Sequence, residues 1–254
     1  MYTEEQLDKL EQEEHSIATE AITLMVLALD SLHADLKKEL TDFYRKYGKD
    51  GVVTYKEARK WVSEKNHTRR LTALLVLLNT KFNDTYLREL EPRFKSFLTK
   101  VIGKESDFFG VDLDADDLLE ESWGVDEATW LTRLEDDVAL WVVYIGNDIK
   151  RALVRRDKLD KVLEQLDKRF MTIERILTNL GVTESTAYGS IARRRVMKNL
   201  GVVKYQFFTR ADERTCEVCG SMHGLIFPIS SYEIGVTASP LHPRCRCWEV
   251  PIVE

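Results

Sequence analysis

The stretch IATEAITLMVLALDSLHADLKKELTDFYRKY, residues 17–47, decides the fold class of this chain. Its apolar residues recur at steps of three and four, the spacing that places side chains on one face of an α-helix. The stretch contains no proline or glycine, and Gly48 and Gly51 follow it directly, where a helix would end. It therefore predicts a long helix with these apolar residues along it: Ile17, Ala21, Leu24, Ala28, Leu29, Leu32, Leu36, Leu40, Phe43 and Tyr47.

The same spacing continues beyond this helix and predicts others. A short helix is expected over residues 54–64 and a long one over residues 71–101, which Pro92 should kink because proline removes a backbone donor. Glycines punctuate residues 103–123, which predicts a loop with a short helix there. A further helix is expected over residues 126–156.

Two more helices are predicted before residue 202. The first covers residues 158–180 and is expected to end at Gly181, because glycine commonly follows the last helical residue. The second should begin at Thr183 or Ser185, whose hydroxyl would accept a hydrogen bond from a first-turn amide. Gly201 would end it.

The period changes after these helices. Residues 202–208, VVKYQFF, are rich in β-branched and aromatic side chains and predict a strand, and residues 225–227 predict a second. The predicted fold is therefore mainly α, with long helices in an N-terminal body, residues 1–180, and a small C-terminal α+β module, residues 181–254.

Composition places the chain among folded globular proteins, with 254 residues, 44% hydrophobic and 31% charged. The first residues are acidic and show neither the basic start nor the apolar core of a signal peptide. No run of eighteen uncharged apolar residues is present, so we expect the chain to need no membrane for folding.

The net charge of −6 is distributed unevenly. Residues 111–139 hold eleven acids against Arg133 alone, a combination that repels DNA. Residues 150–204 hold fourteen bases against six acids, so contact with phosphates is conceivable there, although charge runs are commonly solvated helix faces. The triplet Arg193, Arg194 and Arg195 is the candidate for nonspecific contact with double-stranded DNA.

All four cysteines lie near the C-terminus, at Cys216, Cys219, Cys245 and Cys247. A CxxC turn can aim two thiolates at one tetrahedral zinc ion, and grouped thiols in a reducing cytoplasm bind metal more often than they form disulfides. The second half of the site is either Cys245 with Cys247, or His242 with Cys245. A structural zinc ion would stabilise so small a module. The alternative is that the thiols are reduced and packed beside Trp248.

No enzymatic motif is present. The chain contains no GxSxG, HExxH or phosphate-binding GxxxxGK[ST] sequence, and an isolated histidine such as His223 is most often structural. Four strong ligands would also leave a zinc ion without a position for water. We therefore expect neither catalytic residues nor enzymatic activity. The helix pair on either side of Gly181 could suggest a helix-turn-helix, but many antiparallel pairs look the same.

The C-terminal segment resembles the signature of phage Mu F-like head-morphogenesis proteins. The resemblance rests on an acidic-Arg-Thr lead, a CxxC, a turn before a strand phenylalanine, and a closing His-Pro-any-Cys-Arg-Cys. His223 departs from the pattern, since an Asp is common there. The resemblance is close over the last 40 residues and otherwise extends only to the preceding helix. The matching segments are RADERTCEVCGSMHG at residues 210–224, Phe227, and PLHPRCRC at residues 240–247.

This resemblance implies a minor head protein of a tailed bacteriophage that associates with the portal protein and with packaged DNA. Family members of this kind take part in procapsid assembly and in DNA packaging or ejection, and are not enzymes in that role. Scaffolding and major capsid proteins are further expected partners. The implied location is the portal vertex of the virion, with assembly in the host cytoplasm.

Two other functions compete with this one. The first is a zinc-ribbon protein that binds nucleic acid by itself, against which the acidic half of the chain counts. The second is a phage-encoded nuclease or toxin, since domains of this family are sometimes fused to enzymes. The short sequence after Cys247 and the absence of a catalytic segment before it count against the second.

Overall fold

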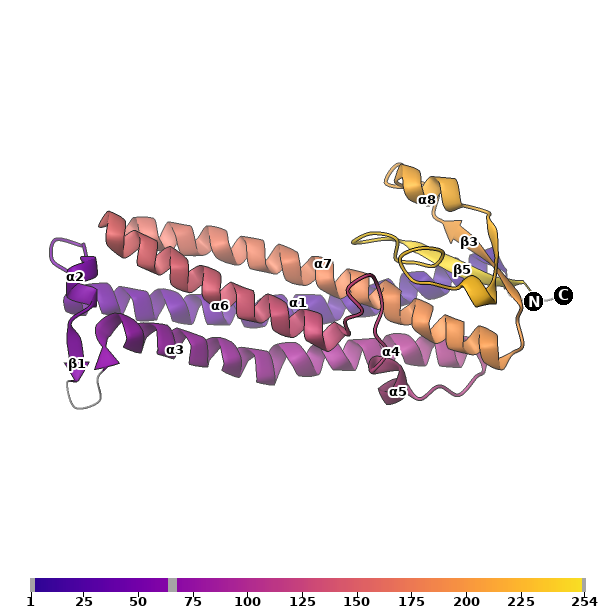
Figure 1. Cartoon of the computed structure of the whole chain (residues 1–254), viewed down its shortest axis with the longest axis horizontal. Coiled ribbons are helices and arrows are strands. Elements are labelled where there is room, and N and C mark those ends of the chain that lie inside the picture. Colours follow the sequence, from indigo (N-terminus) through magenta and orange to yellow (C-terminus); the bar gives the residue numbers. More distant parts are fainter. Residues whose placement is uncertain (1–2, 64–67, 253–254) are drawn as a thin grey trace. The chain divides into compact units, whose positions relative to one another are not determined.

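The computed structural model describes residues 3–63 and 68–252, and 69% of it is helical. Long helices make up most of the chain, and a small module with strands lies in its C-terminal part (Figure 1). The predicted fold class, mainly α with a small C-terminal α+β module, is therefore confirmed.

The elements follow one another from α1 to β5. The long helices are α1 Glu4–Tyr47, α3 Arg70–Thr85, α4 Glu91–Phe109, α6 Trp130–Arg155 and α7 Leu159–Asn199. The short helices are α2 Tyr55–Ala58, α5 Ala115–Leu119 and α8 Glu217–Met222, with a π-helical turn at Tyr86–Leu90 and a 3-10 turn at Ile229–Ser231. The strands are β1 Trp61–Ser63, β2 Thr68–Arg69, β3 Lys204–Thr209, β4 Ile226–Pro228 and β5 Cys247–Ile252.

The chain forms two compact units, each assembled from separate segments. Unit 1 comprises Met1–Thr23, Arg93–Arg133 and Thr178–Glu254, and unit 2 comprises Leu24–Pro92 and Leu134–Leu177. Helices α1, α6 and α7 contribute residues to both units. The predicted division into a body, residues 1–180, and a module, residues 181–254, differs from the division into these two compact units. It stays a prediction about which part of the chain carries which function.

Unit 2 is a bundle to which α1, α3, α6 and α7 each contribute an apolar stripe. Phe82 of α3 stacks on Phe170 of α7 with ring centroids 6.1 Å apart, and His33 of α1 stacks on the same ring at 4.3 Å. The buried residues recur at the helical period that the sequence showed. They include Leu29, Leu36 and Leu40 on α1, Leu71, Leu74 and Leu78 on α3, Trp141, Ile145 and Ile149 on α6, and Val162 and Leu166 on α7.

Unit 1 contains a three-stranded antiparallel sheet with the strand order β4-β3-β5. Tyr205 of β3 lies opposite Phe227 of β4, and Phe208 lies opposite Trp248 of β5. Trp248 packs in a buried cluster with Leu7, Leu10, Phe109 and Val196, which come from α1, α4 and α7. The predicted strands β3 and β4 are confirmed within a residue or two, and β5 is a strand that the sequence analysis missed.

Helix α7 corrects one prediction. The expected stop at Gly181 and new start at Thr183 or Ser185 are wrong, because α7 continues through them. Thr183 Oγ1 donates to the Asn179 carbonyl at 2.7 Å, a bond made inside a helix rather than at its cap. Gly181 serves close packing instead, since a Cβ there would lie 2.7 Å from Ile22 Cγ1.

Three other boundaries also differ from prediction. The helix expected over residues 54–64 is only α2, because Trp61–Ser63 pairs with Thr68–Arg69 as a ribbon, and residue 64 lies outside the described residues. The predicted interruption near Pro92 takes the form of the π-helical turn just before it. Helix α4 then runs through Gly103 to Phe109, so the predicted loop is shorter and contains α5.

Helix α1 is long and apolar enough to cross a bilayer by length and composition, with a window of mean hydropathy 1.4. A core helix of a globular protein has the same properties. Leu29, Leu32, Leu36 and Leu40 are buried, whereas only 28% of the apolar window is buried and Leu24 and Leu27 are exposed.

Candidate metal centre and its surroundings

The CxxC pair lies at the start of α8. Cys216 is the N-cap residue, and its Sγ accepts a hydrogen bond from the Cys219 amide at 3.4 Å. This geometry follows from the sequence, because a capping side chain bonds to the amide two or three residues later. Cys216 is half-buried and Cys219 is buried, with both thiols turned toward one loop.

The loop before β5 supplies the other donors. His242 Nε2 lies 3.2 Å from Cys219 Sγ, and Cys245 Sγ lies 3.7 Å from the same atom. Cys247 is the first residue of β5 and is buried beside Phe207. The structure therefore brings all five predicted donors together, although more than 20 residues separate the two halves in sequence.

Two overlapping groups of donors share Cys219. Cys216, Cys219 and His242 lie within 4.8 Å of one another, and so do Cys219, Cys245 and Cys247. Ligands of a tetrahedral zinc ion with bonds of about 2.3 Å lie about 3.8 Å apart, close to the separations of 3.2 and 3.7 Å at Cys219. Thiolate and imidazole are also the donors that zinc prefers. The residues present therefore fit a zinc ion.

His242 is held in the tautomer that a metal ligand requires. Its Nδ1 lies 2.8 Å from the Pro243 carbonyl oxygen, which can only accept, so Nδ1 carries a proton and donates a hydrogen bond to that oxygen. The lone pair is then left on Nε2, the atom that faces Cys219. A backbone carbonyl on the second ring nitrogen is a common partner of metal-binding histidines.

The thiols favour one negative charge among themselves. Hydrogen bonds from Cys219 and Cys247 lower the pKa of Cys245. The pKa values of Cys219 and Cys247 are raised by their hydrogen bonds to Cys245, by burial and by the charge of Cys245. Several thiolates in this buried group thus require a cation to compensate them.

Contacts outside the cysteines fix both halves of the site. Arg246 binds both carboxylate oxygens of Asp212 at 2.6 and 2.7 Å, which joins the lead of the CxxC to the closing motif. The Arg246 hydrogen bonds outweigh desolvation and lower the pKa of Asp212. Helix α7 holds the closing motif too, because Thr186 Oγ1 donates to the Cys245 carbonyl and Thr183 Oγ1 accepts from the Arg244 amide.

The predicted DNA-contact residues are largely engaged within the protein. Arg193 is 2% exposed and ion-paired with Glu105, so its predicted contact with DNA is wrong for this structure: a phosphate has no access to it. Arg194 pairs with Glu121, and Arg195 pairs with Asp117 and Glu121. Both are partly exposed, and their contact with DNA stays a prediction.

Arg193 instead lies within a buried carboxylate cluster, which we define as Glu14, Glu105 and Glu249 around Arg193. Glu249 accepts hydrogen bonds from Ser190, Tyr232 and the Ser239 amide. Burial raises the pKa of Glu249, and burial with the neighbouring Glu105 charge raises that of Glu14. Sequence reasoning missed this cluster because its members lie on α1, α4, α7 and β5, far apart in the chain.

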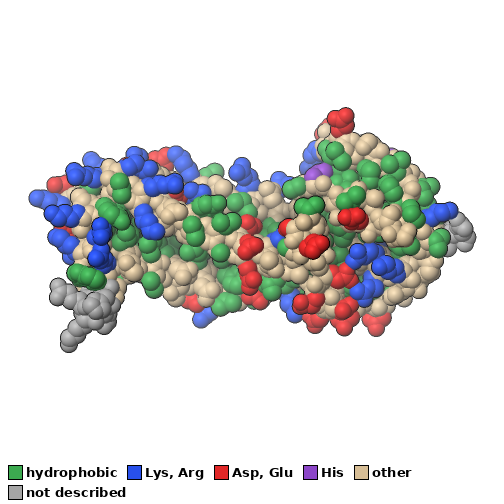
Figure 2. Space-filling view, in the orientation of Figure 1, with side chains coloured by type: hydrophobic (Ala, Val, Ile, Leu, Met, Phe, Trp, Pro, Cys, Tyr) green, Lys and Arg blue, Asp and Glu red, His purple; other side chains and the backbone are tan. Residues whose placement is uncertain are grey.

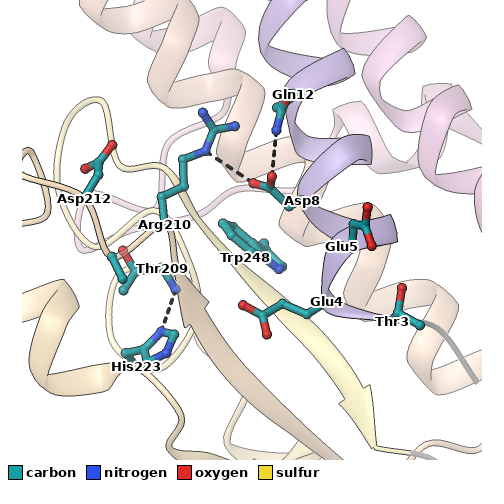
Figure 3. A pocket seen from close by; sticks show the side chains of 11 residues that line it. Thr3, Glu4, Glu5, Asp8, Gln12, Thr209, Arg210, Asp212, His223 and Trp248 are labelled. Atoms are coloured by element: carbon teal, nitrogen blue, oxygen red, sulfur yellow. Dashed lines mark hydrogen bonds and ion pairs between the residues drawn. The ribbon is translucent and has the colours of Figure 1, made fainter.

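A polar cavity of about 700 Å³ lies beside the first turns of α1 (Figure 3). Glu4, Glu5, Asp8 and Arg210 line it, with His223 and Trp248. His223 Nδ1 accepts a hydrogen bond from the Thr209 amide at 3.2 Å, which agrees with the structural role expected for this histidine. The Arg210 side chain points toward Asp8 in the lining of this cavity, with Nε 3.5 Å from Asp8 Oδ1.

Comparison with known proteins bears on the same region. Residues 144–250 match the family model described as Phage Mu protein F like protein. This segment, rather than the whole chain, is therefore similar to the phage Mu F-like family. The matched residues cover the C-terminal part of α6, all of α7 and the module with the Cys/His donors. No curated protein matches the chain, and no solved structure does.

The similarity to this family indicates a phage head-related protein with capsid-related partners in general and a place in the virion. The donors of the candidate metal centre and the residues that fix it lie between Thr183 and Cys247, within the matched segment. The resemblance stated from the motif is thereby confirmed.

Proposed function

We propose that this chain is a minor head protein of a tailed bacteriophage, bound to the portal protein at one vertex of the virion. There it assists procapsid assembly and the packaging or ejection of DNA, first in the host cytoplasm and then in the particle. Scaffolding and major capsid proteins are its further partners. The observation that carries this proposal is the family match over the segment that contains the candidate metal centre.

The proposed role needs no catalytic group. The five donors form two overlapping groups that share Cys219, and four donors would fill the coordination shell of a zinc ion, which leaves no site for an activated water. We propose that the metal is structural zinc and that it holds the loop before β5 against α8. A small module with so little apolar core gains folding free energy from such an ion.

We propose Cys216, Cys219, His242 and Cys245 as its ligands. Cys219 contacts both His242 and Cys245, and the His242 tautomer presents Nε2 to the site. Cys247 belongs to the other group of donors, with Cys219 and Cys245, and in this proposal it is a neighbour of the ion rather than a ligand. Cys247 in place of His242 is the alternative.

The ligand set is tested by zinc content and X-ray absorption on the purified chain. We expect one zinc per chain with three sulfurs and one nitrogen, loss of zinc in His242→Ala, and retention of it in Cys247→Ser. A shell of four sulfurs, with zinc lost only from C247S, would assign Cys247 instead. A zinc-free, folded chain would leave the thiols as core residues.

The function is tested by co-expression with the portal protein of the same phage. We expect the portal to retain the chain on an affinity column, and the zinc-free variant Cys219→Ser to bind at least tenfold more weakly. Failure of the wild-type chain to bind any head protein would contradict the proposal. Duplex DNA binding by the isolated module would then favour the zinc-ribbon alternative.

A further inference from the structure

The basic character of residues 150–204 divides into two parts in the structure. The later part, Arg193 to Arg195, is compensated by acids of unit 1, as described above. The earlier part belongs to unit 2, where residues 150–169 hold eight Lys and Arg against four Asp and Glu. This earlier part surrounds the turn between α6 and α7.

A second basic segment lies beside that turn. Residues 45–60 hold six Lys and Arg against two acids. Val52 forms a β-bridge with Lys158, the Leu159 amide donates to the Gly51 carbonyl, and the Tyr44 hydroxyl donates to the Asp157 carbonyl. We call the exposed Lys and Arg of residues 45–60 and 150–169 the basic end of unit 2. Figure 2 shows Lys and Arg gathered at this end.

Several cations of the basic end are uncompensated. Within the described part of the chain, Arg151, Arg156 and Lys158 are exposed and form no ion pair. Acids near them are already bound, because Asp157 pairs with Arg155 and Lys161. Local positive potential therefore remains available for an external anion.

The basic end also includes a groove of suitable chemistry. A cavity of about 300 Å³ between α6 and α7 is lined by Arg151, Arg155, Lys168 and Arg169 together with Asp148, Gln165 and Thr172. Arg155 and Arg169 are oriented by Gln165 and Asp148. Guanidinium groups held in this way are oriented in advance to donate hydrogen bonds to phosphate oxygens, whereas flexible side chains would first have to be ordered.

We propose that the basic end of unit 2 binds the sugar–phosphate backbone of duplex DNA without reading its sequence. This deepens the proposed function, on which it rests, by assigning the DNA contact to residues 45–60 and 150–169 rather than to the Arg193 triplet. Repeated exposed cations spread over two segments suit a chain of phosphates, whereas base reading needs side chains inserted in a groove. The acids of residues 111–133 belong to unit 1 and oppose DNA there.

The test measures the affinity of the full-length chain for a 30-base-pair duplex of mixed sequence at several salt concentrations. The variant R151Q/R156Q/K158Q removes three exposed cations that hold no ion pair. Lys9, Lys100 and Lys198 are exposed lysines of unit 1, so K9Q/K100Q/K198Q is the control with the same change of net charge.

We expect the basic-end variant to bind at least tenfold more weakly at about 0.1 M salt and the control to bind like the wild type. The slope of log affinity against log salt should fall by about 0.9 for each phosphate that is no longer neutralised, and so by up to about 3. Equal weakening in both triple variants, or unchanged affinity and slope in the basic-end variant, would overturn the proposal. If the basic-end variant bound the portal more weakly but DNA as before, the proposal would be overturned too. The basic end would then bind an acidic protein surface. Retention of the same purified variants by the portal protein is measured in parallel, because it tests the proposed function independently of DNA binding.

Discussion

Arg193 connects four elements of unit 1 through charge. Its guanidinium pairs with Glu105 of α4, lies 3.6 Å from a carboxylate oxygen of Glu249 on β5, and lies 4.0 Å from one of Glu14 on α1. Burial of the guanidinium would lower the Arg193 pKa, but the three carboxylates outweigh it and raise that pKa. Removal of the cation leaves buried anions with nothing to compensate them.

We therefore expect Arg193→Met to lower the free energy of unfolding by about 3–5 kcal/mol, the usual cost of removing one partner of a buried ion pair. Urea denaturation followed by circular dichroism measures this. The neighbouring Arg195→Gln is the control, since its partly exposed pairs should contribute less than about 1 kcal/mol. Equal effects of the two substitutions would show that the buried cluster carries no special weight.

Glu14 gives the cluster a dependence on pH. Its Oε1 is buried without a hydrogen-bond partner among the described residues, and burial raises its pKa well above the ordinary value of 4.5. A carboxyl with a raised folded-state pKa stabilises the fold below its unfolded pKa. This contribution is lost as the pH rises through the folded-state value.

The variant Glu14→Gln should thus exceed the wild type in stability at pH 8 by about 1 kcal/mol or more, and the difference should vanish toward pH 4.5. Unfolding curves at pH steps between 4.5 and 8 measure it. Adjacent Glu13, whose hydrogen bond to Lys104 lowers its pKa, is the matched control and should respond in the opposite direction. A flat difference between E14Q and the wild type across this range would be inconsistent with the raised pKa.

At the scale of elements, α7 depends on a glycine for packing rather than for its ending. Gly181 permits the close approach of Ile22 on α1, and Gly189 similarly leaves room for Glu14, whose Oε2 would lie 2.9 Å from a Cβ there. Helix propensity alone would favour alanine at both positions. Packing against α1 therefore overrides the local preference.

Gly181→Ala is expected to destabilise the protein by about 1–2 kcal/mol, because overpacking by roughly 1–3 kcal/mol exceeds the helix-propensity gain of about 1 kcal/mol. Gly103 on α4 has no atom within 4 Å of its Cβ position, so Gly103→Ala should stabilise by about 1 kcal/mol. Melting temperatures of the two variants give the comparison. Stabilisation by both would mean that Ile22 moves aside without cost.

At the scale of the whole molecule, the candidate metal centre and the helical bundle stabilise different units. The candidate metal centre lies in unit 1, whose sheet has a small core, whereas unit 2 is held by the apolar stripes of α1, α3, α6 and α7. Loss of the metal should therefore act locally.

Chelation of zinc is expected to increase amide hydrogen exchange in α8, β4 and the loop before β5, and to leave α3 and residues 134–177 protected. Hydrogen exchange with mass spectrometry on the full chain, with and without chelator, measures this. Arg246→Gln breaks the link to Asp212 and should give a milder increase in the same segments. Exchange that rises equally in both units would indicate that the metal supports the whole fold.

The sequence by itself determined the helical class, strands β3 and β4, and the five donors of the candidate metal centre. These features depend on local period and on residue type at short spacing, both of which are visible in one dimension. The same holds for the resemblance to the phage Mu F-like family, because its motif is a fixed order of neighbouring residues at positions 210–247.

Only the tertiary structure decided the rest. Whether Gly181 ends a helix depended on Ile22 of α1, and whether the Arg193 triplet is free depended on Glu105 and Glu121. Strand β5 exists because β3 pairs with it. In each case the deciding partner lies tens of residues away in the chain, where packing and charge compensation outweigh local preference.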